Sequence, residues 1–222
     1  MIRKILVAIA VSLVFCGCSI AENASEKKAE PQWQMLFDGK TLNGWVQHGG
    51  KAKFEVDPNE QAIVGTTVPN THNSFLCTEK EYGDFVLELD FMIDPNLNSG
   101  VQFRSHVRPD PNLGEVVYGY QVEIDPSPRS WTGGLYEESG RGWLKDLSDR
   151  EFARKAFKPG QWNHIRLEAK DYMYRIWVNG VQAAEAIDFK SRKGFIGLQV
   201  HKVKNSNVRQ VRFKNIKIQV FD

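Results

Sequence analysis

The chain has 222 residues, of which 41% are hydrophobic, and its 29 basic and 27 acidic residues leave a formal net charge of +2. This composition is sufficient for one large all-β domain or two small ones, and it argues against disorder outside the first residues. Phosphate binding would need a basic stripe, so the near balance of charge excludes a nucleic-acid partner from the expected functions.

The first residues have the pattern of a secretory signal. Arg3 and Lys4 precede an apolar run over residues 5–15 that is too short for a comfortable membrane span. The Phe-Cys-Gly-Cys run that follows resembles the lipobox of bacterial lipoproteins, and by that resemblance Cys18 is the lipidated cysteine. We therefore expect a lipoprotein signal peptide over residues 1–18 and a charged, flexible tether over residues 19–32. Plain cleavage without lipidation is the alternative.

These expectations place the protein outside the cytoplasm. It would be secreted across the inner membrane and held as a periplasmic or cell-surface lipoprotein, attached to the membrane through its N-terminal lipid. With Cys18 at the new N-terminus, Cys77 would be the only thiol of the domain, so no disulfide framework is expected. A lone cysteine in an apolar strand pattern is typical of a small buried hydrophobe.

From residue 33 onward the pattern is one of strands and turns. Short strands separated by Asp-Gly, Gly-Gly and Asp-Pro-Asn turns are expected at residues 33–37, 44–47, 53–56 and 61–65. Residues 85–93 alternate apolar and polar positions and predict the clearest half-buried strand. Residues 98–105 predict a partner strand, and a proline-rich loop over residues 108–114 leads into a strand at residues 118–126.

The second half is predicted to begin with an irregular loop over residues 129–149, whose length indicates a functional role. Ser148 and Glu151 have capping-box spacing and predict a helix over residues 148–157. The last strands are expected at residues 162–170, 172–178, 181–184, 194–201 and 208–221. About a dozen strands without alternating helices indicate a single all-β domain over residues 33–222, an antiparallel sandwich whose two sheets form a jelly roll.

The strand at residues 118–126 carries the strongest functional signal. Since successive side chains of a strand point to opposite faces, Val122 and Ile124 face the core, whereas Gln121, Glu123 and Asp125 share the other face. Three acceptor-rich groups in a row favour a site that binds or deprotonates a ligand over a merely polar sheet face.

Two further strands repeat this division. In one of them Gln102 and Arg104 lie opposite an apolar face, and in the other Gln199 and His201 do so. If the three strands share a sheet, its outer surface is a polar concavity. Arg104 could instead form a structural salt bridge with an acid of the next strand.

Aromatic residues of the loop at residues 129–149 suggest a sugar ligand. Trp131, Tyr136 and Trp143 lie among glycines, and such rings stack on the apolar faces of pyranoses, although they could also belong to the core. No zinc spacing or phosphate loop is present in the sequence. A divalent metal is possible only if Glu123, Asp125 and His201 lie close together.

Eight short motifs, in this order, resemble the 3-keto-disaccharide hydrolase domain family. They are FDGKTLNGW at residues 37–45, NSGVQFRS at 98–105, the strand at 118–126, TGGLY at 132–136, GQWN at 160–163, VNG at 178–180, GLQVH at 197–201 and FKNI at 213–216. The resemblance implies a concanavalin A-like jelly roll, as in lectins and glucanases. It also implies cleavage of glycosides already oxidised to a ketone at C3, and hence an upstream sugar 3-oxidase.

The implied reaction suits these residues. A ketone at C3 acidifies the hydrogen at C2, so a base can remove it, the enolate can expel the C1 substituent, and water can then add. We expect Glu123 and His201 as base and acid, with Asp125 orienting them or holding a metal. Substrate ligands would come from the remaining polar and aromatic residues, namely Arg104 for the oxyanion with Gln121 or Gln199, and Gln102, Tyr136, Arg141, Trp131 and Trp143 around the sugar.

A second resemblance bears on the choice between retaining hydrolysis and elimination. Residues 123–125 begin like the Glu-x-Asp-x-x-Glu signature of laminarinase-type glucanases, but residue 128 is proline where that signature has its acid. Ordinary retaining hydrolysis needs a second carboxyl about 5 Å from the first, whereas elimination through a ketone does not need that pair. The rival to an enzyme is a non-catalytic carbohydrate-binding lipoprotein, because lectins share the same sandwich.

Overall fold

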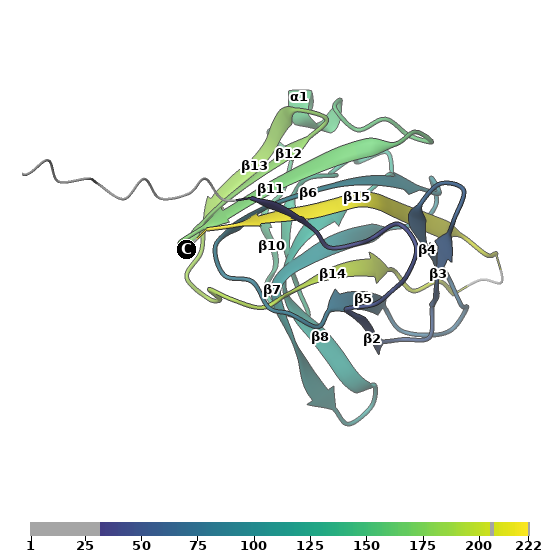
Figure 1. The fold of residues 1–222 in the computed structure, drawn as a ribbon. Coiled ribbons are helices and arrows are strands. Elements are labelled where there is room, and N and C mark those ends of the chain that lie inside the picture. Colours follow the sequence, from purple (N-terminus) through teal and green to yellow (C-terminus); the bar gives the residue numbers. More distant parts are fainter. Residues whose placement is uncertain (1–31, 205–206, 222) are drawn as a thin grey trace, which may run out of the picture. The chain divides into compact units, whose positions relative to one another are not determined.

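The computed structural model describes residues 32–204 and 207–221 (Figure 1). The predicted signal peptide, Cys18 and nearly all of the predicted tether lie outside the described residues. The described residues form fifteen strands and one short helix. The strands are β1 (Trp33–Met35), β2 (Trp45–Gly49), β3 (Lys53–Asp57), β4 (Ala62–Thr66), β5 (Ser74–Thr78), β6 (Phe85–Ile93), β7 (Ser99–Asp110), β8 (Gly114–Ile124), β9 (Leu135–Glu138), β10 (Gly142–Lys145), β11 (Asn163–Lys170), β12 (Met173–Val178), β13 (Val181–Ile187), β14 (Phe195–Val200) and β15 (Gln210–Val220), and the helix is α1 (Glu151–Arg154).

The strands form two sheets, which are seen as two layers in Figure 1. One sheet has the order β13-β12-β11-β6-β15-β4-β3, with β1 paired to β15, and the other has the order β10-β9-β8-β7-β14-β5-β2. Each pairing between these strands is antiparallel. The predicted antiparallel two-sheet jelly roll is therefore confirmed.

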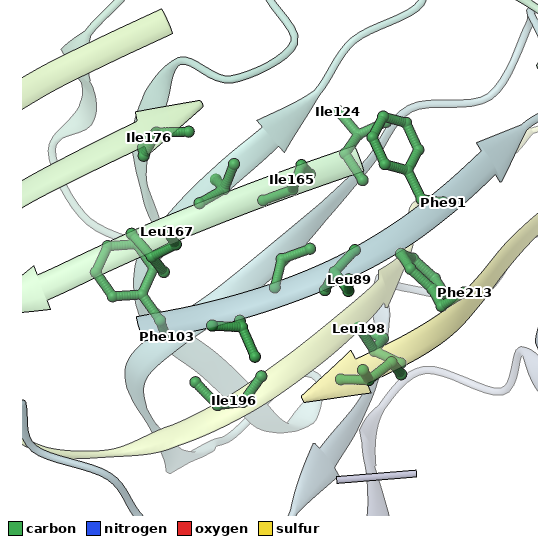
Figure 2. Close-up of a cluster of buried hydrophobic side chains, with 14 of the residues drawn as sticks. Leu89, Phe91, Phe103, Ile124, Ile165, Leu167, Ile176, Ile196, Leu198 and Phe213 are labelled. Carbon is green, nitrogen blue, oxygen red and sulfur yellow. The ribbon is translucent and has the colours of Figure 1, made fainter. Parts of the chain in front are cut away.

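The hydrophobic core lies between the two layers. The apolar positions of the alternating strand Phe85–Ile93 are all buried, as the pattern predicts. Figure 2 shows Leu89 and Phe91 of this strand in one cluster with Ile124 and Leu198 of the other sheet. Burying such a side chain stabilises the fold by about 1.5–3 kcal/mol. The core therefore fixes which face of β8 and β14 points away from it.

The segment at residues 129–149 differs from its prediction. Two short strands, β9 and β10, lie within it and extend the second sheet. The predicted helix is reduced to Glu151–Arg154, because Ser148 does not cap it; its backbone and hydroxyl groups bond to Asp146 instead. Within the described part of the chain, no helix is long and apolar enough to cross a membrane.

Strands β7 and β8 form a long hairpin whose tip extends past the ends of β14 and β5 in Figure 1. Much of the predicted loop at residues 108–114 therefore belongs to these two strands. The register of the hairpin shifts between Phe103 and His106, where Arg104 has a φ of +46°. Such a bulge leaves an extra residue in one strand and breaks the alternation of faces.

Candidate functional site

A cleft of about 560 Å³ lies over the second sheet, on the face that points away from the core. The polar sides of β8, β9 and β14 contribute to it, because their alternate residues are held in the core. The residues that line it from the strands are Gln121, Glu123, Tyr136, Glu138, Trp143 and Gln199. The structure thus brings together side chains from three consecutive strands, β8, β9 and β10, and from β14, which is distant from them in sequence.

Gly100 of β7 leaves space for the side chain of Gln121 at the bottom of the cleft. A Cβ atom on Gly100 would lie 2.3 Å from Cδ of Gln121, which is closer than atoms can approach. The missing side chain therefore lets Gln121 lie across the neighbouring strand. This arrangement directs the amide of Gln121 along the floor of the cleft toward Glu123.

Side-chain amides hold the carboxyl group of Glu123 from two directions. Nε2 of Gln121 donates to one oxygen at 2.7 Å, and Nδ2 of Asn98 donates to the other at 2.7 Å. Oε1 of Gln121 in turn accepts a hydrogen bond from Gln102 at 2.5 Å. Gln102 is buried beneath this chain of hydrogen bonds and does not line the cleft, so its predicted role as a substrate ligand is wrong and it supports Gln121 instead.

Glu123 has the protonation behaviour of a group that can exchange a proton near neutral pH. Burial raises its pKa to about 7, and the negative charges of Asp125 and Glu138 act in the same direction. The hydrogen bonds from Asn98 and Gln121 partly oppose this rise because they favour the charged form. Perturbed carboxyls in clefts are frequent at functional sites.

Glu138 is a second carboxyl group in the cleft, and sequence reasoning missed it. Its oxygens accept hydrogen bonds from Asn73 at 3.1 Å and from Gln199 at 3.4 Å, and burial raises its pKa. Oε1 of Gln199 is buried and has no hydrogen-bond partner among the described residues, so it can accept a bond from a ligand hydroxyl. Tyr136 and Glu138 share one face of β9, but a strand of four residues is too short for this alternation to be recognised in the sequence.

His201 follows the end of β14 and lines the same cleft. Its Nδ1 lies 3.0 Å from the carbonyl oxygen of Lys202, and because a carbonyl only accepts, this nitrogen carries the hydrogen. Burial lowers the pKa of His201 and the charge of Lys202 adds to that effect, although the hydrogen bond to the Lys202 carbonyl opposes it. The imidazole is therefore neutral near pH 7 and has an unprotonated Nε2.

Asp125 and the residues after it form one end of the cleft. An oxygen of Asp125 lies 2.8 Å from Nε of Arg129, and the other accepts from the backbone N–H of Ser127 at 3.1 Å. Burial raises the pKa of Asp125, but these bonds outweigh it and lower the pKa overall. The guanidinium of Arg129 also lies over the rings of Trp131 and Trp143, at 4.4 and 5.4 Å from their centroids.

The aromatic residues divide between the cleft and its support. Tyr136 and Trp143 line the cleft, with their ring centroids 5.2 Å apart. Trp131 instead packs against the core and meets Trp143 edge to face at 5.0 Å. Trp131 therefore positions Trp143 and is not itself part of the cleft wall, which corrects its predicted role.

The prediction that Arg104 shares a pocket with Glu123 is wrong. The bulge turns its side chain into the space between the sheets, where it is fully buried and lies over the ring of Tyr174. It donates to the carboxylate of Asp84 at 2.7 Å and to the backbone oxygens of Gly83 and Asp171. Arg104 is thus a structural cation, as the alternative expected, although its acidic partner Asp84 comes just before β6 of the other sheet and not from the next strand.

Arg141 is also placed away from the cleft. It pairs with Asp188 at 2.8 Å and with Glu137, whose side chain is buried and also contacts Lys190. These groups join β9 to the segment after β13, so the predicted role of Arg141 in binding substrate is not supported by its position.

The possible metal site is not formed by the described residues. Among residues 32–204 and 207–221, no three His, Cys, Asp or Glu side chains lie close enough together to hold a metal ion. Glu123, Asp125 and His201 all line the cleft, but Asp125 is engaged by Arg129 and the three do not converge on one point.

Solved structures with the same fold include both candidate enzymes and sugar-binding proteins. A candidate glycosyl hydrolase from Parabacteroides distasonis has a TM-score of 0.59 and 22% identity, over 86% of this chain and 94% of that one. The carbohydrate-binding module CBM66 from Bacillus subtilis has a TM-score of 0.55 and 16% identity, over 79% and 95%. A galectin-like protein of unknown function from Bacillus subtilis has a TM-score of 0.56 and 11% identity, over 85% and 98%.

Family membership comes from a different comparison. No curated protein gives a significant match to the chain. The family model described as the 3-keto-alpha-glucoside-1,2-lyase-like domain matches residues 32–219, which confirms the resemblance carried by the eight sequence motifs. Since this match includes almost all of the chain after the predicted leader, the protein belongs to the family of 3-keto-alpha-glucoside-1,2-lyase-like domains.

Proposed function

We propose that this protein cleaves glycosides whose sugar carries a ketone at C3, by elimination followed by hydration. Membership of its family supports a function on carbohydrates. The observation that carries the proposal is Glu123, a buried carboxyl group in a polar cleft, held by two amides and with its pKa raised to about 7. A base of that strength is suited to removing a proton made acidic by a neighbouring ketone.

The reaction proceeds in two stages. Glu123 takes the proton from C2, and the electron pair of that C–H bond forms the enolate of the C3 ketone. The enolate re-forms the ketone as the C1–O bond breaks, which leaves a double bond between C1 and C2. Water then adds across this bond, with its hydroxyl on C1 and a proton on C2, and gives the free 3-keto sugar. This route forms no covalent bond between the sugar and the enzyme, so it does not need the carboxylate nucleophile of a retaining glycosidase.

The other residues of the cleft have supporting roles. Burial raises the pKa of Glu138 and so favours its protonated form, in which it gives a proton to the departing oxygen; its charge acts on Glu123 only when it is ionised. His201, neutral with a free Nε2, is the alternative base. Gln199 accepts a hydrogen bond from a sugar hydroxyl through its free Oε1, Gln121 holds the carboxyl group of Glu123, and Asp125 keeps Arg129 at the end of the cleft.

The aromatic pair Tyr136 and Trp143 provides a wall for the apolar face of the sugar ring. Because Arg104 lies outside the site, Lys202 is the cation that lines the cleft beside Glu138, and it offers charge to a developing enolate.

A non-catalytic carbohydrate-binding protein is the second function with support. Its support is the sandwich fold shared with a carbohydrate-binding module and the sugar-sized polar cleft. Such a protein would bind oxidised and unoxidised sugars and turn over neither.

One experiment separates these functions. Purified protein is incubated with a 4-nitrophenyl 3-keto-glucoside and with the unoxidised glucoside, and release of nitrophenol is followed. Release from the keto sugar alone is expected, and Glu123→Gln should abolish it while calorimetry still detects binding. Release from the unoxidised glucoside as well would identify ordinary hydrolysis, and binding without release from either sugar would identify a binding protein.

This reaction requires a preceding enzyme and a location in the cell. A sugar 3-oxidase must act first, because the ketone that acidifies C2 has to be formed before cleavage. We propose that Cys18 carries a lipid and holds the domain on a membrane outside the cytoplasm. Mass spectrometry of the mature N-terminus would test this, since an unmodified residue there would contradict lipidation.

A further inference from the structure

A second compartment of about 170 Å³ opens directly beside the cleft. The two share three lining residues, Asn73, Glu138 and Lys202, so they form one continuous depression with a common border. The cleft holds Glu123 and the aromatic wall, whereas the second compartment lies under the β7–β8 hairpin, where Leu113 and Val117 line it. A ligand longer than one ring would extend from the first space into the second.

The hairpin that covers this compartment is fixed in place. An oxygen of Asp110 accepts the backbone N–H groups of Asn112 and Leu113, both at 2.9 Å, which orders the turn. Farther along the hairpin, Glu115 accepts the backbone N–H of Gly49 at 2.8 Å and lies 3.1 Å from Nδ1 of His48. These bonds fasten the hairpin to β2, so the compartment is preformed and needs no closing motion.

The lining of this compartment is amphipathic. Leu113, which is 37% exposed, provides apolar surface above the buried side chains of Phe75 and Val117, while the amide of Asn73 and the carboxyl of Glu138 provide hydrogen-bonding groups at the border. A pyranose has the same two characters, an apolar ring face and a rim of hydroxyls. A phosphate-bearing ligand fits less well, because two carboxyl groups, those of Glu115 and Glu138, line the same space.

We propose that this compartment binds the leaving sugar of a 3-keto-disaccharide, while the oxidised ring occupies the cleft. This inference rests on the proposed function. Glu138 stands at the border and therefore lies next to the oxygen that links the two rings. As the C1–O bond breaks, its electron pair goes to that oxygen, which takes the proton of Glu138, and the C2 proton remains on Glu123. The free second sugar then leaves from beneath the hairpin.

The test compares substrates with and without a second ring. Maltose and cellobiose oxidised at C3 of the non-reducing ring are compared with the matching methyl 3-keto-glucosides, so that both anomers are included. For Leu113→Ala, the ratio of kcat/KM for the disaccharide to that for the methyl glycoside should fall about tenfold, which is typical for a lost apolar contact in a pocket. Ile187→Ala, an exposed aliphatic residue of the other sheet, is the matched control and should leave the ratio unchanged.

The outcomes distinguish failure of the proposed sugar subsite from failure of the proposed function. An unchanged ratio in Leu113→Ala, or an equal fall for both kinds of substrate, would overturn the subsite while leaving the proposed function intact. If wild-type protein cleaves none of these sugars, the proposed function fails, and the subsite is then judged by calorimetry with unoxidised maltose, cellobiose and glucose. Tighter binding of a disaccharide than of glucose, weakened about tenfold by Leu113→Ala, would support it; equal affinities would overturn it.

Discussion

Glu123→Gln should change how the stability of the protein depends on pH. The Glu123 side chain is almost fully buried, and its pKa is raised from an ordinary 4.5 to about 7 by burial and by the charges of Asp125 and Glu138. The folded protein thus holds this proton more tightly than the unfolded chain does. The resulting stabilisation is complete below pH 4.5 and is lost as the pH rises through about 7. At about 1.4 kcal/mol for each pH unit, the loss is about 3 kcal/mol.

The variant cannot ionise at this position, so it does not undergo that loss. It does lose one hydrogen bond at every pH, because either Asn98 or Gln121 then faces an amide N–H₂ group, at a cost of about 1 kcal/mol. We therefore expect Glu123→Gln to be about 1 kcal/mol less stable than wild type at pH 4 and about 2 kcal/mol more stable at pH 8. Urea unfolding at pH 4, 6 and 8 measures both differences.

Asp125→Asn is the matched control, with the opposite sign. The bonds from Ser127 and Arg129 outweigh burial and lower the pKa of Asp125, so its stabilisation is present above its ordinary value of 3.8 and is lost in acid. This variant should be less stable than wild type at pH 8, and the difference should shrink at low pH. A stability difference for Glu123→Gln that is the same at pH 4 and pH 8 would refute the raised pKa and the reasoning built on it.

Three further predictions concern the framework of the site. Arg104→Met should lower the free energy of unfolding by about 3 kcal/mol or more, because Asp84 loses its buried partner. The kcat per folded molecule should not change. A fall in kcat with the fold intact would show that Arg104 takes part in the reaction. Gly100→Ala should displace Gln121 and cost about 1–3 kcal/mol, measured by thermal melting, and an unchanged melting temperature would contradict the close contact. Cys77 is fully buried and burial raises its pKa, so a thiol reagent should label it only after unfolding; rapid labelling of the native protein would contradict this burial.

The polar face of β8 was predictable from sequence because a regular strand keeps its period of two. Val122 and Ile124 are fixed in the core, so Gln121 and Glu123 must point outward, and the same logic holds for Gln199 on β14. Most of the strands were also predictable from the turn residues between them, but β9 and β10 lie in the segment that was predicted as a loop. Local geometry alone was sufficient for these features.

The errors arose where a nonlocal or irregular feature decided the direction of a side chain. At Arg104 an extra residue in β7 breaks the alternation, and nothing in the local sequence marks this bulge, since the residue in the left-handed conformation is not a glycine. Glu138 was missed because β9 has four residues, which are too few to show a period. One of the two partners of Arg141, Asp188, is on a segment 47 residues away, so the direction of the Arg141 side chain depended on the complete fold.

The placement of the two carboxyl groups favours an enzyme over a binding protein. Hydroxyls of a sugar can be held by neutral amides such as Gln121 and Gln199, which cost little to bury when they are hydrogen-bonded. Glu123 instead lowers the stability of the folded protein by about 3 kcal/mol above neutral pH, and Glu138, also buried, increases that cost by its charge. A binding function gains nothing from this loss, whereas a base needs a pKa near the working pH. Glu123→Gln should therefore give a protein that is more stable at pH 8 and still binds sugar but no longer cleaves it, the pattern expected when stability is lost for catalysis.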